Sequence, residues 1–167
     1  MRDRVWAAER RAEALRERGH LPSMRGTRPR ISPARHKPIL PEAPNGFVAM
    51  QRLRCPADGS CFYHAVARAV GSGNHEVIRN LVIKELSKTK STAQDFAAIA
   101  RAKAHDWAET EEVIACANAL RCRIYVFETA HNMWVQFGDD KFERCIHLIN
   151  HDMVHFEPLR GQMIESA

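Results

Sequence analysis

The chain has 167 residues, of which 45% are hydrophobic and 27% are charged, and this length suits one compact domain with an appendage. No apolar run approaches the roughly 18 residues that cross a bilayer, and the charged N-terminus lacks the apolar core of a secretory signal peptide. We therefore expect no membrane span and no secretion. The five cysteines are odd in number and lack framework-like spacing. They favour a reducing compartment, which predicts a cytoplasmic protein, or one of the host cytoplasm if it belongs to a pathogen.

The excess positive charge is confined to the first quarter of the chain. Residues 1–45 contain 11 Lys and Arg against 5 Asp and Glu, whereas residues 46–167 contain 14 against 15. A nucleic-acid-binding domain usually has its basic surface on the folded part, so we expect no obligatory nucleic-acid partner. The alternative for the basic arm is an adaptor role, in which it contacts an acidic partner such as nucleic acid or a membrane surface.

The composition divides the chain into three regions. Residues 2–18 are rich in Ala, Glu and Arg, which predicts an exposed helix that ends before Gly19. The following stretch, up to residue 45, contains six of the eight prolines, which predicts a disordered basic linker. We expect an N-terminal region over residues 1–45, a folded domain over 46–160 and a short tail over 161–167.

The folded domain is predicted to begin with a strand and to continue with helices. Residues 47–54 suggest the strand, and apolar residues at helical spacing follow from residue 61 onward. Asn74 and Thr110 are expected to cap two of the helices. The four predicted helices span residues 61–70, 74–86, 93–105 and 110–120.

The periodicity then changes to that of strands. Residues 122–127 and 133–137 are rich in β-formers and are joined by a short polar connection, which predicts a hairpin. Two further strands, over 145–149 and 153–156, are expected around a polar turn. Helices followed by antiparallel strands in a separate block indicate an α+β domain.

The most informative stretch for chemistry is Asp58-Gly-Ser-Cys-Phe-Tyr-His-Ala65. It places Cys61 at the first position of an apolar helix, where free amides and the helix dipole favour a thiolate. The amides of Gly59, Ser60 and Cys61 are candidates for an oxyanion hole. The alternative is that Cys61 is an ordinary buried cysteine, since free cysteines are often buried.

A nucleophilic cysteine needs a histidine that is distant in sequence and near in space. His155 lies in the last predicted strand, and Glu157, two residues later, points to the same side of that strand. One carboxylate is therefore placed to orient one imidazole, as in a Cys-His-acid triad. His147, His151 and His155 recur every four residues, but the expected strand and turn and the lack of a Cys-x-x-Cys pair predict no metal site and no cofactor.

Together these motifs resemble the ovarian-tumour (OTU) family of cysteine proteases, which are mostly deubiquitinases. The Asp58–Ala65 block resembles the family's Asp-Gly-x-Cys nucleophile block. Trp107, the helix from Glu111 and the strand Ile124-Tyr-Val126 are similar to its Trp-containing loop, helix and strand. Val154-His-Phe-Glu157 resembles its His-aromatic-acid ending, and the compactness of the domain resembles that of viral and bacterial members.

The resemblance implies a papain-like fold, in which helices flank a mixed, mainly antiparallel sheet. It implies that Cys61 is the nucleophile, His155 the general base and Glu157 the residue that orients it, while Asp58 shapes the oxyanion turn or serves as an alternative acid. Trp107 is expected to support the active site or to be an ordinary core aromatic.

The implied reaction is hydrolysis of the isopeptide bond after the C-terminal Gly-Gly of ubiquitin or a ubiquitin-like modifier. The modifier's basic tail suggests that acidic residues guide it, namely Asp106, Glu109, Glu111 and Glu112. Two alternatives stay open: a catalytically inactive module that binds ubiquitin, and a viral protease of the same chemistry that processes its own polyprotein.

Overall fold

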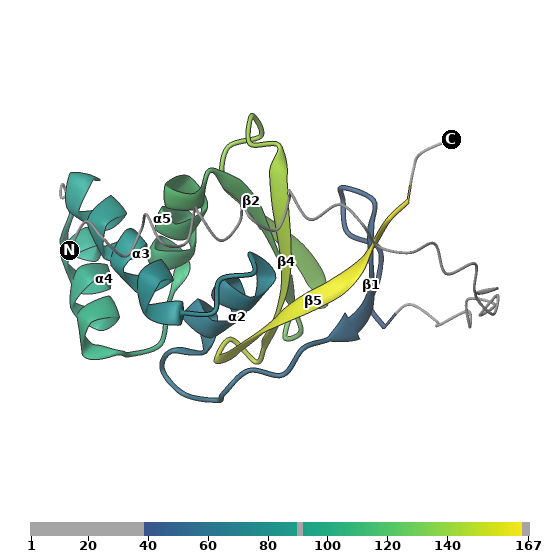
Figure 1. Ribbon diagram of the computed structural model, residues 1–167, viewed down its shortest axis with the longest axis horizontal. Helices are drawn as coiled ribbons and strands as arrows, with labels where there is room; N and C mark the ends of the chain where they lie inside the picture. Colours follow the sequence, from purple (N-terminus) through teal and green to yellow (C-terminus); the bar gives the residue numbers. More distant parts are fainter. Residues whose placement is uncertain (1–38, 90–91, 165–167) are drawn as a thin grey trace, which may run out of the picture. The chain divides into compact units, whose positions relative to one another are not determined.

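The computed structural model describes residues 39–89 and 92–164 (Figure 1). The predicted N-terminal helix and most of the predicted linker lie outside these residues. The first elements along the described chain are the strand β1 (Phe47–Arg52) and the helices α2 (Cys61–Ala69), α3 (His75–Thr89), α4 (Ala93–Ala104) and α5 (Thr110–Leu120). The remaining strands are β2 (Cys122–Glu128), β3 (Met133–Phe137), β4 (Arg144–His151) and β5 (His155–Met163).

The four helices predicted for the folded domain are present within one or two residues of their expected starts, because each has a strong local signal. Asn74 accepts the Glu76 amide at 2.9 Å through its side chain, so it serves as the expected cap of α3. Thr110 is the first residue of α5 and not its cap. The cap is Glu109, which forms a capping box with Glu112.

The five strands form one mixed sheet in the order β1-β5-β4-β2-β3. β2 and β3 form the predicted antiparallel hairpin, and β4 and β5 form a second one. β2 and β4 run parallel, because the chain passes through the β3 strand before it returns beside β2. The predicted α+β fold, with helices beside a mixed and mainly antiparallel sheet, is confirmed.

The helices form two tiers against the sheet. α2 packs on β4 and β5, and α5 packs on β2 and β3. α3 and α4 contact the other helices and not the sheet, and they lie at the far end of the helical group in Figure 1. The main core fills the space between helices and sheet, with Phe62, Val66, Ile124, Leu148 and Phe156 among its buried residues.

A second, smaller core covers the other side of the sheet and includes part of the segment that was expected to be a disordered linker. Ala43 is buried there with Phe47 and Leu159, and the Trp134 indole donates to the Pro41 carbonyl at 3.0 Å. Residues 39–45 therefore pack on the sheet and belong structurally to the folded domain.

β5 also continues beyond residue 160, where we expected the domain to end. Its last three residues pair with β1, and Gly161 lies opposite Ala49. Among the described helices, none combines the length and the apolar character needed to cross a membrane.

Candidate active site

Cys61 is positioned by a tight turn at the start of α2. The Asp58 carbonyl accepts the Cys61 amide at 3.0 Å, and the Asp58 side chain accepts the Ser60 amide at 2.8 Å. These two bonds turn the chain into the helix, so Asp58 has the turn-shaping position that we expected.

Only glycine fits at position 59, because another part of the backbone lies directly against this turn. A Cβ atom on Gly59 would be 2.0 Å from the His105 carbonyl oxygen, far inside any real contact. The loop before Cys61 therefore packs backbone to backbone on His105 and Asp106, immediately before Trp107. The Trp107 side chain is 40% exposed, so it is not a core aromatic residue.

Arg79 of α3 fixes the same turn, and no motif in the sequence marked it as a site residue. Its guanidinium is 2% exposed and lies over the Tyr63 ring, 4.1 Å from the ring centroid. It donates to the Ser60 hydroxyl at 2.6 Å and to the Ala102 carbonyl at 2.9 Å. The available signal was an arginine on the apolar face of α3, between Ile78 and Val82.

The β4–β5 hairpin brings His155 to the cysteine. The two strands pair so that His151 lies opposite His155, across a turn in which Asp152 and Met153 have positive φ angles of 52° and 64°. The Cys61 thiol donates to the Val154 carbonyl at 3.7 Å, which joins residues 93 positions apart. The thiol also interacts with the Phe156 backbone, so the sulfur lies against the chain on both sides of His155.

The two ring nitrogens of His155 have different surroundings: one lies near Glu157 and the other has no hydrogen-bond partner among the described residues. His155 Nε2 is 3.7 Å from one oxygen of Glu157, whose side chain is 10% exposed. His155 Nδ1 is buried and has no hydrogen-bond partner among the described residues. It is therefore available to take a proton from a neighbouring group.

The order of cysteine, histidine and acid along this chain agrees with a match to a known family. The model described as OTU-like cysteine protease matches residues 56–156, more than half of the chain. The chain belongs to the OTU-like cysteine protease family.

Solved structures agree with this assignment at the level of fold. The Hazara virus OTU bound to ubiquitin is 20% identical, with a TM-score of 0.53 over 68% of this chain and 82% of that one. An OTU domain in complex with ubiquitin is 21% identical, with a TM-score of 0.56 over 72% and 74%. A Wolbachia pipientis wMel OTU deubiquitinase bound to ubiquitin is 16% identical, with a TM-score of 0.51 over 71% and 98%. No curated protein sequence gives a significant match.

The electrostatics of this OTU domain oppose a free thiolate at Cys61. Burial raises the pKa of the Cys61 thiol, and the backbone amides at Phe156 and Phe62 lower it by less. The helix start therefore favours the thiolate as expected, but burial outweighs it. Ionisation of Cys61 needs a proton acceptor, and His155 is the titratable residue between Val154 and Phe156, whose backbone groups the sulfur contacts.

The amides proposed for the oxyanion hole are not all free. We expected free donors at Gly59, Ser60 and Cys61, but the Ser60 and Cys61 amides both donate to Asp58. The compact turn that presents the cysteine uses them, so they become available to a substrate only if Asp58 releases them.

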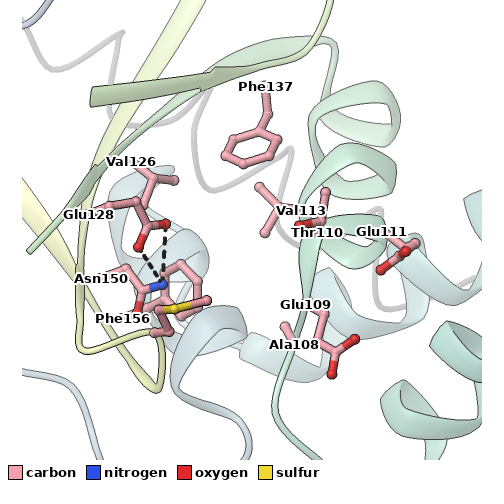
Figure 2. Close-up of a pocket in the computed structure, with 11 residues that line it drawn as sticks. Ala108, Glu109, Thr110, Glu111, Val113, Val126, Glu128, Phe137, Asn150 and Phe156 are labelled. Atoms are coloured by element: carbon pink, nitrogen blue, oxygen red, sulfur yellow. Dashed lines mark hydrogen bonds between the residues drawn. The ribbon is translucent and has the colours of Figure 1, made fainter. Parts of the chain in front are cut away.

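A cavity of about 410 Å³ opens beside the β4–β5 hairpin of the OTU domain. Figure 2 shows that Phe137, Val126 and Val113 line one part of it, while Glu109 and Glu111 lie at the start of α5. Its remaining lining residues are Ala108, Thr110, Glu128, Asn150, Met153 and Phe156. The cavity therefore has both apolar and polar walls, with the Glu128–Asn150 pair on one side and Glu109 and Glu111 at the start of α5.

Glu112 was expected to be one of the acidic residues that guide a basic tail, and this prediction is wrong. It is fully buried, and both of its oxygens accept from Arg101, at 3.0 and 2.9 Å. A buried and paired carboxylate cannot meet a substrate, so Glu112 is structural. Within the described chain, no three His, Cys, Asp or Glu side chains are grouped so that they could hold a metal ion.

Proposed function

We propose that this protein is a deubiquitinase that hydrolyses the isopeptide bond after the C-terminal glycine of ubiquitin or a ubiquitin-like modifier. The observation that carries the proposal is the contact of the Cys61 sulfur with the backbone beside His155, whose Nδ1 is unpartnered and whose Nε2 faces Glu157. Support for the substrate comes from the structurally similar OTU proteins that were solved with ubiquitin bound.

In the proposed first step, His155 takes the Cys61 proton at Nδ1 and the sulfur attacks the carbonyl carbon of the modifier's terminal glycine. The oxyanion that forms is stabilised by backbone amides at the start of α2, each contributing about 3 kcal/mol, and in this step Asp58 releases the Ser60 and Cys61 amides to it. Protonated His155 then gives its proton to the leaving lysine amine, and a thioester remains. Glu157 holds the imidazole in the orientation that both transfers need.

In the second step, His155 removes a proton from water, which attacks the thioester and releases the modifier's carboxylate and the Cys61 thiol. The high pKa that burial gives to Cys61 suits this mechanism, because the thiol ionises only when His155 accepts its proton. Glu109 is exposed and Glu111 is partly buried, and both line the cavity and contact Arg101. With Glu112 they place three carboxylates on one guanidinium, so the start of α5 keeps a net negative charge for a basic tail.

The test is labelling with a ubiquitin probe that has an electrophile at its C-terminus. The wild-type protein is expected to form a covalent adduct, and Cys61→Ala is expected to form none. Cys145→Ala is the control, since Cys145 is a partly buried free thiol of the same domain and lies at the opposite end of β4 from His151. An adduct on Cys61→Ala would contradict the choice of nucleophile, and ubiquitin binding without any adduct would favour an inactive binding module.

A further inference from the structure

A second histidine lies on the acid of the candidate triad. His151 Nε2 is 3.2 Å from one oxygen of Glu157, while His155 Nε2 is 3.7 Å from the other. The two imidazoles are 6.1 Å apart and nearly parallel, with an angle of 21° between their planes. One carboxylate therefore bridges two histidines, and the shorter contact is to the one outside the triad.

The hairpin register explains this arrangement. His151 is the last residue of β4 and pairs directly with His155, the first residue of β5. Side chains of opposed residues lie on the same face of an antiparallel pair, and Glu157 shares that face because it is two residues along. The turn at residues 152–153 thus fixes His151, His155 and Glu157 as one group.

Arg52 of β1 completes the surroundings of the carboxylate. Its Nη1 is 3.2 Å from His151 Nε2, and its Nε is 3.8 Å from the same Glu157 oxygen that His151 contacts. The Cys55 thiol faces Glu157 as well, but burial raises its pKa to about 11, so it stays protonated and adds no charge.

The hydrogen-bonding rules decide which way the His151 bond runs. Arginine only donates and an ionised carboxylate only accepts, so His151 Nε2 either accepts from Arg52 or donates to Glu157. Both contacts measure 3.2 Å, so burial decides between them. The Glu157 side chain is 10% exposed and needs a donor from the protein, whereas the Arg52 side chain is 52% exposed and can donate to water instead. The donor form is therefore favoured, and Arg52 adds a longer contact to the same oxygen.

We infer that His151 is a positioning residue, which holds the Glu157 carboxylate by a hydrogen bond so that its other oxygen stays directed at His155. Glutamate has one more rotatable side-chain bond than aspartate, and a carboxylate that turns freely orients an imidazole poorly. The bond from His151 removes that freedom. This inference rests on the proposed function of Cys61, His155 and Glu157.

The experiment compares two substitutions of the same residue. His151→Gln keeps an N–H donor near the position of Nε2, whereas His151→Met has similar size and no donor. In cleavage of a ubiquitin substrate, His151→Met is expected to lower kcat on the order of ten- to a hundredfold with KM unchanged. His151→Gln is expected to restore most of the loss, and His131→Met, in the exposed β2–β3 turn, is the control.

A double-mutant cycle tests whether His151 acts through Glu157. In a Glu157→Gln background, His151→Met is expected to cause little further loss, because the group that it positions is already altered. The rate of Cys61 alkylation by iodoacetamide is measured in the same variants, since it depends on the Cys61–His155 pair and needs no ubiquitin. Alkylation is expected to follow the same order of variants as kcat.

The outcomes separate the two claims. If the wild-type protein neither reacts with the ubiquitin probe nor cleaves the ubiquitin substrate, the proposed function is wrong. The alkylation rates of Cys61 then decide the role of His151 by themselves. The inference is overturned if His151→Met reacts like the wild type, if His151→Gln is as slow as His151→Met, or if the losses simply add in the Glu157→Gln background.

Discussion

At the scale of single residues, burial decides the charge of the titratable groups more than their local sequence does. His147 illustrates this away from the active site. Its ring stacks on Phe47, with centroids 3.7 Å apart, and on Tyr125 at 5.2 Å. Asn45, from the segment expected to be disordered, lies at hydrogen-bond distance from its Nε2. The sequence showed only a histidine in an apolar strand.

The His147 environment predicts a loss of stability in mild acid. Burial, with a smaller effect from Arg123, lowers the pKa of His147 from 6.5 to about 4. Between these values the unfolded chain binds a proton that the folded one does not, so the free energy of unfolding falls as pH falls from 6.5 to 4. The loss is at most about 3 kcal/mol, from 1.36 kcal/mol for each unit. Urea unfolding at pH 7 and pH 4.5 measures it.

The control for this prediction is His147→Phe, which keeps a stacking ring and removes the titration. Its stability should change less between the two pH values than that of the wild type. An equal change in both proteins would show that other groups cause the acid sensitivity.

At the scale of elements, the active site depends on helices that never touch the sheet. α3 contributes Arg79, which binds the turn before α2 and the last turn of α4 at once. The Arg101–Glu112 pair then joins α4 to the start of α5, on the other side of the Trp107 loop. These contacts fix the loops on both sides of Cys61, although no single motif includes them.

Arg79→Met is expected to lower stability and reactivity together. The substitution leaves the Ser60 hydroxyl and the Ala102 carbonyl without their buried partner, at a cost of about 1–3 kcal/mol for each group. Urea unfolding should show the loss, and probe labelling of Cys61 should slow under conditions where the variant is folded. Lys84→Met, at an exposed position of the same helix, should change neither. Full-rate labelling of a folded Arg79→Met protein would contradict the role of Arg79 in holding the turn.

At the scale of the whole described domain, the first and the last described strands pair with each other. β1 and the end of β5 are about a hundred residues apart and form the edge of the sheet. Gly161 makes this pairing possible, because a Cβ there would lie 1.9 Å from the Val48 carbonyl oxygen. The edge strand in turn supplies Arg52 to the acid of the candidate site.

Gly161→Ala is therefore expected to destabilise the domain by about 1–3 kcal/mol, the usual cost of overpacking, or more if β1 separates. The free energy of unfolding from urea titration measures this. Gly73→Ala is the matched control, since no atom lies within 4 Å of a Cβ at that position. Equal stability of the two variants would mean that the β1–β5 edge adds little.

Local sequence accounts for the features that depend on neighbouring residues. Helix starts, the β2–β3 hairpin, the family motifs and the placement of Cys61 at the start of α2 all follow from local spacing and capping groups. The candidate triad was also predicted from the sequence, because its motif was specific enough to connect Cys61 with His155.

Which distant groups share one environment depends on how the whole chain folds. Three features did not follow from the sequence. They are the burial of Arg79 and Glu112, the bonds from the Ser60 and Cys61 amides to Asp58, and the bridge from His151 through Glu157 to His155. Each depends on strand register or on helix packing. A shift of one residue in the β4–β5 register would turn His151 away from the face that His155 and Glu157 share, and local sequence does not fix that register.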